Sequence, residues 1–387
     1  MANIGIISEF NPFHTGHKHL IEKIKGENDT VICVMSGNFV QRGDVAVLNK
    51  ADRVRAALQN GADLVIELPC PYSLATAQRF AKGSVALLKA TGIIDEICFG
   101  SESGDISVLL QIAEILSSNK FNEKIASRLK SGDTFAKIRT DLLSEYSKDF
   151  AAALQNPNNI LGVEYILAAK ALSANFGFRT IKRIGAAHDS QSAEKTASAS
   201  YIREHILKGD LKSVEHFLPS KIDTDNFADI KRLESAILAS LRLNNTPERY
   251  ALLPDISEGI ENRIVEAVKT ASTLEELFET IKTKRYTLSR IRRIILSAFL
   301  GITQEISAIS QPYLRILGFT QKGQAALKEI AKTSDLPIIC TASDANRLSG
   351  DAAELFQLEC KASDLWALAL NYPQNCGNEY FYKIVKE

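Results

Sequence analysis

The sequence predicts an α/β protein, with a Rossmann-like, doubly wound parallel sheet followed by a mainly helical C-terminal domain. Strand-like apolar runs occur in the first half of the chain at residues 4–7, 31–35, 64–68 and 97–99. Between them lie helical patterns at residues 17–24, 50–59 and 78–89. This alternation is typical of a parallel sheet with helices on both faces. Later in the chain, helical spacing of apolar residues predominates.

The remainder of the first half completes this predicted sheet. A helical stretch runs from about residue 106 to about residue 172, with apolar residues at helical spacing in 134–143 and 160–171. Residues 179–184 then indicate a last strand, and residues 198–207 indicate a helix after it. The strands and helices up to this point account for one domain.

A boundary is predicted at Leu218-Pro219, which divides the chain into domains 1–218 and 219–387. In the second domain, helices are expected at residues 230–243, 258–271, 274–283, 288–300 and 352–370. A small strand–helix–strand unit is expected at residues 313–317, 322–330 and 336–340.

The composition is that of an ordinary globular protein of 387 residues, 45% hydrophobic and 24% charged. The formal net charge is zero, so any binding to nucleic acid needs a local basic patch. The six cysteines form no Cys-x-x-Cys pair, and there is neither a basic leader before an apolar block nor an apolar run long enough to cross a bilayer. We therefore expect reduced thiols, no membrane association and a cytoplasmic location.

The turn after the first predicted strand carries His14 and His17, separated by Thr15 and Gly16. The start of a helix has free N–H donors and partial positive charge, so it can hold a phosphate. Imidazoles on its first turn can hydrogen-bond that phosphate while charge builds at the α-phosphorus. This His-x-Gly-His pattern is typical of nucleotidylyl transferases and predicts use of ATP. The alternatives are a histidine pair for a metal, which lacks a convincing third ligand, and ordinary polar residues at a helix start.

A second pattern, at residues 196–203, follows the last predicted strand and opens a helix. Ser198 and Arg203 could there hold the β- and γ-phosphates, at the same carboxyl edge of the sheet as the histidines. In the alternative interpretation, the serines simply cap the helix and Arg203 is a surface residue.

Four further segments are expected near this edge. Gly100 ends a strand and would let adenine or ribose approach the backbone closely, although the segment could be a simple turn. Asn158 and the adjacent Asn159 precede a helix that either could cap. Arg183 ends a strand and suits phosphate through its planar fork, and His188 follows it. Residues 36–43 form a polar loop that could contact a second substrate or be plain surface.

Residues 281–293 contain six basic side chains and no acidic one. The basic residues are Lys282, Lys284, Arg285, Arg290, Arg292 and Arg293. Because solvated helix faces usually mix signs, this run favours a polyanion partner over a plain exposed face. Tyr286 within it could stack on an unpaired RNA base.

Taken together, these motifs resemble the bacterial tRNA(Met) cytidine acetate ligase family. The resemblance is carried in order by residues 9–17, 36–43, 67–69, 99–102, 157–162 and 198–203. It extends into the basic stretch at 284–293, covers most of the chain and is weakest after about residue 319. The combination is specific, whereas each motif alone is common.

The resemblance implies a ligase that activates acetate with ATP, giving acetyl-adenylate and diphosphate. The acetyl group then passes to N4 of the wobble cytidine in the anticodon loop of elongator tRNA(Met), and acetyl-coenzyme A is not the donor. Mg²⁺ is expected to accompany ATP. On this basis domain 1–218 is the ATP-binding catalytic domain and domain 219–387 binds the tRNA. The implied partners are tRNA and acetate, without a membrane, without protein ligands to a metal, and with no inferable protein partner.

The expected site residues fall into three groups. His14 and His17 are expected to be catalytic. ATP is expected to contact the segment Ile7, Ser8, Glu9, Phe10, Asn11, Pro12, Phe13, His14, Thr15, Gly16, His17, Lys18, His19 and Leu20, together with Gly100, Asn158, Arg183, Ser198 and Arg203. The tRNA is expected to contact Lys284, Arg285, Arg290, Arg292 and Arg293.

Two other functions share part of this pattern. A small-molecule adenylyltransferase would use the same histidine turn and Ser–Arg motif, but the large extra region is unusual for such an enzyme. A non-catalytic, nucleotide-sensing RNA-binding protein is the second alternative. Release of diphosphate in the presence of ATP, acetate and tRNA would distinguish the three.

Overall fold

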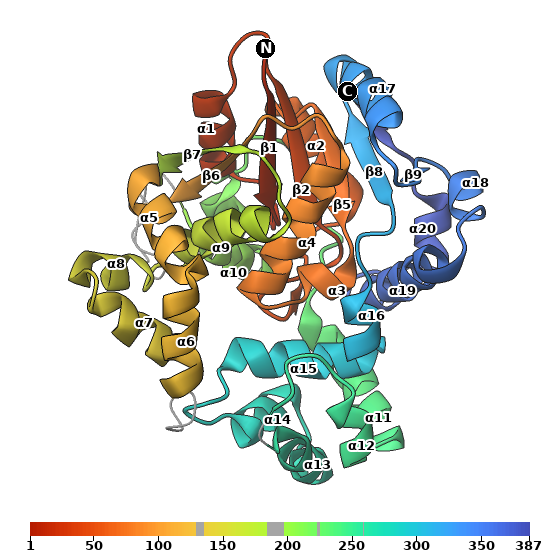
Figure 1. Ribbon diagram of the computed structural model, residues 1–387. Coiled ribbons are helices and arrows are strands. Elements are labelled where there is room, and N and C mark those ends of the chain that lie inside the picture. Colours follow the sequence, from red (N-terminus) through yellow and green to blue (C-terminus); the bar gives the residue numbers. More distant parts are fainter. Residues whose placement is uncertain (129–134, 184–196, 223–224, 258) are drawn as a thin grey trace.

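The computed structural model describes residues 1–128, 135–183, 197–222, 225–257 and 259–387, and it is built around one twisted sheet (Figure 1). The central strands are β1 (Asn3–Ser8), β2 (Thr30–Ser36), β5 (Leu64–Leu68), β6 (Glu96–Ser101) and β7 (Gly177–Lys182). They are parallel neighbours in the order β5-β2-β1-β6-β7. This order reverses between β1 and β6, where such sheets bind ligands. The predicted α/β fold class and these five strands are confirmed.

Both faces of this sheet are covered, which explains why its strands are apolar without interruption. In β2, Val31, Cys33 and Met35 pack on one face, while Ile32 and Val34 pack on the other. The first face is covered by α1 (Thr15–Ile24) and α2 (Lys50–Gln59). The second is covered by α4 (Ala77–Ala90), α5 (Ile106–Ser117), α9 (Pro157–Ala171) and α17 (Gln321–Thr333).

Two groups of helices extend beyond the sheet (Figure 1). The first comprises α6 (Asn119–Arg128), α7 (Phe135–Ser144) and α8 (Lys148–Ala153). The second comprises η4 (Ile230–Leu233), α11 (Glu234–Leu243), α12 (Pro247–Ala251), α13 (Ile260–Thr270), α14 (Leu274–Ile281), α15 (Leu288–Leu300) and α16 (Gln304–Ala308). This second group, which we call the helical part, forms its own hydrophobic core together with α19 (Gly350–Ala367).

The C-terminal region also contributes strands to the main sheet, and this corrects the expected division at residue 218. Strand β8 (Leu314–Phe319) pairs with β5 in the antiparallel direction, and β9 (Ile338–Ile339) and β10 (Val385–Lys386) pair with β8. The predicted strand–helix–strand unit therefore exists, but it extends the first sheet instead of belonging to a separate helical domain. Pairing across such a sequence distance leaves no local signal.

Buried charges reinforce this junction. The ammonium group of Lys50 in α2 lies 2.7 Å from a carboxylate oxygen of Glu67 in β5, and it also contacts Glu379 in α20 (Asn378–Phe381). Arg315 of β8 donates to the carbonyl of Glu379 at 3.0 Å. The end of the chain is thus bound to the centre of the sheet by groups that are all buried.

The sequence patterns did not predict several short elements. A two-stranded hairpin joins β3 (Phe39–Val40) to β4 (Asp44–Val45), and α3 (Cys70–Ser73) and α18 (Ala342–Ala345) are single turns. Helix α10 (Ala199–Leu207) lies where a helix was expected. Two 3-10 turns, Leu211–Ser213 and Glu215–Phe217, come after it. Across the described ranges of the chain, no helix has the length and apolar character needed to traverse a bilayer.

Candidate active site

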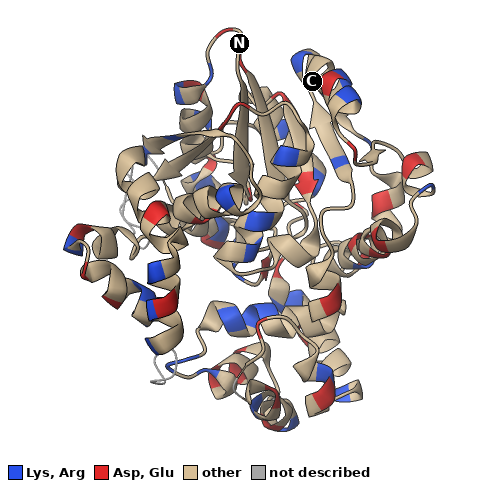
Figure 2. Ribbon diagram, viewed as in Figure 1, with Lys and Arg blue, Asp and Glu red and all other residues tan. Residues whose placement is uncertain are grey.

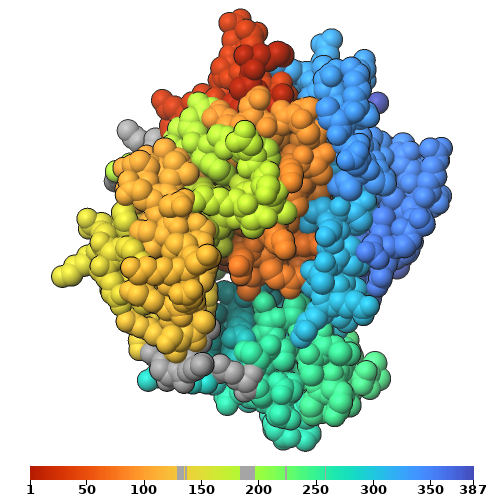
Figure 3. All heavy atoms as spheres, viewed as in Figure 1, coloured from red at the N-terminus to blue at the C-terminus, as the bar shows by residue number. Residues whose placement is uncertain are grey.

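A cavity of about 870 Å³ opens at the carboxyl ends of β1 and β6. Its walls come from the ends of these strands, the first turns of α1, α4, α9 and α10, the β3–β4 hairpin, and α15. The surface is hollowed where the yellow helices α6–α8 face the teal helical part, below α9 and α4 (Figure 3). The cavity therefore lies at the switch point of the sheet, where sequence analysis expected the phosphates.

The turn between β1 and α1 has an unusual backbone that brings both histidines to the helix start. Phe10 adopts a positive φ of 44°, and the Asn11–Pro12 peptide bond is cis. His14 is the N-cap of α1, and its ring accepts the N–H of Gly16 at 3.0 Å. A Cβ on Gly16 would lie only 2.7 Å from that ring, so a larger residue at this position would displace the imidazole of His14.

The two imidazoles complete a reciprocal cap. Nδ1 of His17 accepts the backbone N–H of His14 at 3.3 Å, and the two ring centroids lie 4.0 Å apart. Because each Nδ1 accepts a hydrogen bond, the neutral rings carry their proton on Nε2. Each ring therefore keeps one N–H donor for a ligand, and this is the chemistry that a charged phosphate oxygen needs.

The electrostatic environment keeps both rings neutral. Burial, followed by the positive charges of Arg183 and Arg203, lowers the pKa of His14 from 6.5 to about 3. Burial and the neighbouring His14 likewise lower the pKa of His17 well below its usual value. Near neutral pH the histidines are thus hydrogen-bond donors rather than cations, and the positive charge of the site comes from the arginines and the helix start.

Arg53 of α2 holds the loops around this turn. Its guanidinium is fully buried and donates to the carbonyls of Leu48, Glu9, Ser36 and Gly37, at distances of 2.7–3.2 Å. It therefore ties the end of β1 to the end of β2. No sequence motif indicated this role, because an arginine within a helical pattern is usually interpreted as a surface residue.

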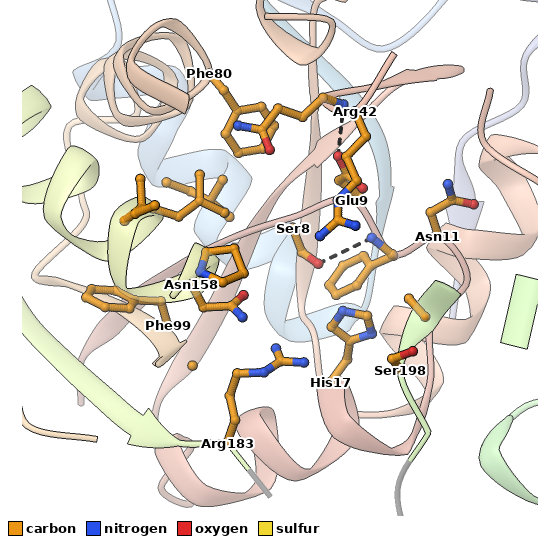
Figure 4. Close-up of a pocket in the computed structure, with 18 of the residues that line it drawn as sticks. Ser8, Glu9, Asn11, His17, Arg42, Phe80, Phe99, Asn158, Arg183 and Ser198 are labelled. Atoms are coloured by element: carbon orange, nitrogen blue, oxygen red, sulfur yellow. Dashed lines mark hydrogen bonds between the residues drawn. The ribbon is translucent and has the colours of Figure 1, made fainter. Parts of the chain in front are cut away.

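The other predicted ATP residues come together around the histidines. Gly100, Asn158, Arg183, Ser198 and Arg203 all line the cavity. In the close-up, Arg183, His17 and Ser198 lie at one end, with Asn158 beside them (Figure 4). A Cβ on Gly100 would meet Arg183 at 3.3 Å, so the glycine makes room at the point where these two strands end.

The asparagine pair has separate roles. Asn159 is buried and accepts the N–H groups of Glu102 and Ser103, at 3.0 and 3.1 Å, whereas Asn158 faces the cavity. Neither caps α9 with its side chain. Instead, the carboxylate of Glu102 accepts the N–H groups of both residues, so the predicted asparagine cap is wrong.

Ser198 both caps a helix and faces the cavity, and Arg203 is not the surface residue of the alternative interpretation. Ser198 is the N-cap of α10 and accepts the N–H of Tyr201 at 3.2 Å, yet it also lines the cavity. Arg203 is half-buried instead of lying on the surface, and it donates to the carbonyl of Asn11 at 2.7 Å. One of its functions is therefore to hold the histidine turn in place.

Within the segment from Ile7 to Leu20, the side facing the cavity is Ile7, Ser8, Glu9, Phe10, Asn11, His14, His17 and Leu20. Pro12, Phe13, Thr15, Gly16, Lys18 and His19 do not line it. Phe13 instead packs into the core beneath α1. The helical period explains this division, since residues one position away from His17 point to other faces of α1.

The basic run of residues 281–293 is not one exposed patch. Figure 2 shows positive residues along α15. Within it, Arg290 donates to the carbonyl of Asp255 at 2.7 Å and to the hydroxyl of Ser257 at 2.7 Å. Arg293 pairs with the carboxylate of Asp255 at 3.1 Å and lines the cavity. Lys284 and Arg285 are exposed.

Tyr286 corrects one expectation from this run. Its ring is buried, its hydroxyl donates to the carbonyl of Ser257 at 2.8 Å, and Arg290 lies over its face. It is therefore not presented for stacking on a base. His188 and Thr196, which belong to the predicted site segments, lie outside the described residues.

Part of the cavity wall comes from residues that no sequence pattern indicated. Phe80 and Thr76 come from the start of α4, Tyr165 comes from α9, and Ser289 comes from α15. Phe80 and Tyr165 look like ordinary core residues in the helical patterns. Gln41 and Arg42, in the loop expected near the pocket, do line it.

The fold and the cavity define the class of protein. A family model described as HIGH Nucleotidyl Transferase matches residues 1–379, so the chain is a member of that class.

Similar proteins narrow this assignment to one family. A tRNA(Met) cytidine acetate ligase of Thermoanaerobacter sp. is 39% identical, and one of Acetivibrio thermocellus is 36% identical, each with 100% of both chains covered. Among solved structures, Thermotoga maritima TmcAL bound with alpha-thio ATP is 29% identical with a TM-score of 0.89, and its apo form is 30% identical with a TM-score of 0.90. Each match covers 100% of this chain and 99% of the other. The chain belongs to the tRNA(Met) cytidine acetate ligase family.

Proposed function

We propose that the chain acetylates N4 of the wobble cytidine of elongator tRNA(Met), using acetate and ATP and releasing AMP and diphosphate. The observation that carries this proposal is the pair of neutral imidazoles at the start of α1. Both face a cavity at the switch point of the sheet, with one N–H donor each available for a phosphate. The names of the relatives supply the acceptor and the acyl donor class.

In the first step, a carboxylate oxygen of acetate attacks the α-phosphorus of ATP. The new P–O bond forms as the bond to the β-phosphate oxygen breaks, and diphosphate leaves with the electron pair. His14, His17 and the N–H groups of α1 stabilise the extra negative charge on the α-phosphate. We propose that Arg183, Ser198 and Arg203 hold the departing phosphates in line.

In the second step, the N4 amine of cytidine attacks the carbonyl carbon of acetyl-adenylate. A C–N bond forms, the C–O bond to the phosphate breaks, and AMP leaves with the electron pair while N4 gives up one proton. We propose that Gly100, Asn158 and the apolar wall formed by Ile160 and Leu161 hold the adenosine portion during both steps. The site thus keeps the activated acetate until the amine arrives.

Magnesium fits this site as a companion of ATP. Among the residues that the structure describes, no three His, Cys, Asp or Glu side chains gather as metal ligands. Mg²⁺ typically keeps several waters and binds substrate phosphates, so it does not need a cage made by the protein. We propose that it enters with ATP and supplies charge neutralisation for the diphosphate.

We propose that the tRNA binds across the helical part and brings its anticodon loop to the cavity. The exposed Lys284 and Arg285 immediately precede α15, whose Ser289 and Arg293 line the cavity. Two exposed positive charges thus lie close in the chain to residues of the cavity wall, and this supports the proposal. The base would swing out of the loop to reach the acetyl group.

The test is mass spectrometry of nucleosides from elongator tRNA(Met) incubated with the protein, ATP, Mg²⁺ and acetate. We expect N4-acetylcytidine that depends on ATP and acetate and does not form when acetyl-coenzyme A replaces both. A matched tRNA with uridine at the wobble position should give no product. Transfer of AMP to a small-molecule acceptor without tRNA, or no release of diphosphate at all, would contradict the proposal.

A further inference from the structure

One end of the cavity lies away from the residues expected to hold the phosphates, and Glu9 is the member of the predicted ATP segment that reaches it. Phe80 and Arg42 lie at this end in Figure 4, away from Arg183, His17 and Ser198, with Glu9 next to Arg42. Ser289 and Arg293 of α15 also line the cavity and are not among the predicted ATP residues. A cavity of about 870 Å³ is near the upper limit for sites that bind one small molecule, which are roughly 300–1,000 Å³.

This end is assembled from segments far apart in the chain. The backbone N–H of Gln41 donates to a carboxylate oxygen of Glu9 at 2.9 Å, and Arg293 donates to the carbonyl of Gln41 at 3.4 Å. The ion pair with Asp255 fixes Arg293 from its other side. The β3–β4 hairpin is therefore held between the end of β1 and helix α15.

Gly43 allows this assembly. It has a positive φ of 76°, and a Cβ there would lie 2.5 Å from Cβ of Arg292 and 2.8 Å from the backbone nitrogen of Arg293. Only glycine combines that backbone with so close an approach to a helix. The hairpin is thus fitted against α15, the helix that follows the exposed Lys284 and Arg285 in the chain.

The side chains at this end match the groups of a cytosine base. Cytosine is flat, presents an N–H donor at N4 and acceptors at N3 and O2, and proteins that bind it commonly accept from N4 with a carboxylate. Extruded bases are held by stacking on aromatic side chains and by contacts to this same edge. Here Phe80 supplies an aromatic ring, Glu9 a carboxylate, and Arg42 a donor of hydrogen bonds.

The occupant also follows from position. Acetate is small and has to lie beside the α-phosphate, at the histidine end. The cytidine has to enter from the side where the tRNA is bound, and α15 borders the cavity on that side. An aromatic ring at the same end of the cavity as an arginine suits an RNA base better than it suits a second small anion.

We infer that the end of the cavity formed by Glu9, Arg42, Phe80 and Arg293 is the subsite for the acceptor cytosine. This inference rests on the proposed function. Phe80 stacks on the base, Arg42 and Arg293 bind its acceptor edge or the adjoining phosphates, and Glu9 accepts the N4 hydrogen bond. When the C–N bond forms and AMP leaves, the carboxylate of Glu9 takes the proton that N4 releases.

The experiment compares Phe80→Leu and Arg42→Gln with the wild-type protein. ATP affinity is measured by calorimetry without tRNA, and acetyl transfer is measured by mass spectrometry of the tRNA nucleosides. Both variants should bind ATP within about twofold of wild type and lose at least about tenfold in transfer, because stacking on one base, or one hydrogen bond from a charged donor, typically contributes that much. Leucine retains apolar volume, so the core around α4 remains filled.

Matched variants separate this effect from general damage. Phe121→Leu changes an equally buried phenylalanine of the same core that is away from the cavity, and Arg347→Gln removes an exposed charge from a distant turn. Both should leave transfer unchanged.

Equal losses of ATP affinity and transfer in Phe80→Leu or Arg42→Gln would overturn the inference and assign those residues to the nucleotide. Unchanged transfer in both would overturn it as well. Failure of the proposed function is distinguishable, because the wild-type protein itself would then give no N4-acetylcytidine, and the inference would fall with it.

Discussion

Helices α1 and α15 both reach the cavity, but they hold their polar side chains differently. In α1, His14 and His17 each accept one backbone N–H within their own turn, which leaves the second ring nitrogen for a ligand. In α15, Arg290 and Arg293 bind Asp255 and Ser257, which lie before α13 at sequence separations of 33–38 residues. Much of the hydrogen-bonding capacity of these arginines is already used within the protein.

Side-chain length determines whether a charge or donor in the sequence indicates a ligand-binding group. A short side chain at a helix start is satisfied by the adjacent backbone, so its free donor has one direction. A long arginine side chain has five donors and reaches many partners, so its position in a basic run does not show what it binds. We expect the histidines to govern the chemistry and the arginines to divide between structure and substrate.

The largest expected effect is that of His17→Ala. Removing one preorganised donor to a phosphate that gains charge should lower the rate of transfer about 10²–10³-fold, while tRNA affinity stays nearly unchanged. Single-turnover kinetics and a filter-binding titration would measure the two quantities. His205→Ala, on α10 and paired with Asp210, is the matched histidine control and should retain full activity. A comparable loss of tRNA binding in His17→Ala would contradict an electrostatic role.

A second prediction concerns the stability of the histidine turn at acid pH. The pKa of His14 is about 3 in the folded chain and 6.5 as the reference value, so the unfolded chain binds more protons between these values. The contribution of His14 to stability is thus complete above pH 6.5 and is lost as the pH falls toward 3, by at most about 1.4 kcal/mol per pH unit.

His14→Asn keeps a good N-cap and removes this titration. Urea unfolding at pH 7 and pH 5 should show a smaller loss of unfolding free energy on acidification than in the wild-type protein. Identical losses in the two proteins would mean that His14 titrates normally in the folded state.

The smallest effect is expected for the basic run. Lys284→Ala should lower the salt dependence of tRNA binding by about 0.7–0.9 in the slope of log K against log salt, because one phosphate contact is lost. Arg290→Ala is the matched comparison. It should leave that slope unchanged and lower the free energy of unfolding by about 1–2 kcal/mol, since charged hydrogen bonds to Asp255 and Ser257 disappear. The reverse pattern would show that α15 presents Arg290 to the RNA.

The same contrast explains which parts of the fold could be predicted from sequence. The central strands were predictable because burial on both faces makes each one a continuous apolar run, as in residues 31–35. Helix α1 and its two histidines were predictable because capping is local. The place of β8 was not, since nothing in residues 314–319 indicates that their partner is β5.

The cavity shows the same limit. Gly100, Asn158 and Arg183 end strands or start helices at one edge of the sheet, so topology alone brings them together. Phe80 lies in the first turns of a long amphipathic helix, where an aromatic residue is normally interpreted as part of the hydrophobic core. Arg293 was assigned to the tRNA by its charge, and only the packing of α15 against the hairpin shows that it reaches the cavity.

The antiparallel pairing of β8 with β5 has a consequence for how this chain can be divided. The helical part lies in the chain between α10, which follows β7, and β8, so both of its ends are joined to the sheet domain. A fragment that stops before β8 would expose the backbone of β5 as an unpaired edge, which invites aggregation. The helices of this part can therefore be exchanged or removed only as an internal insertion, with both junctions preserved.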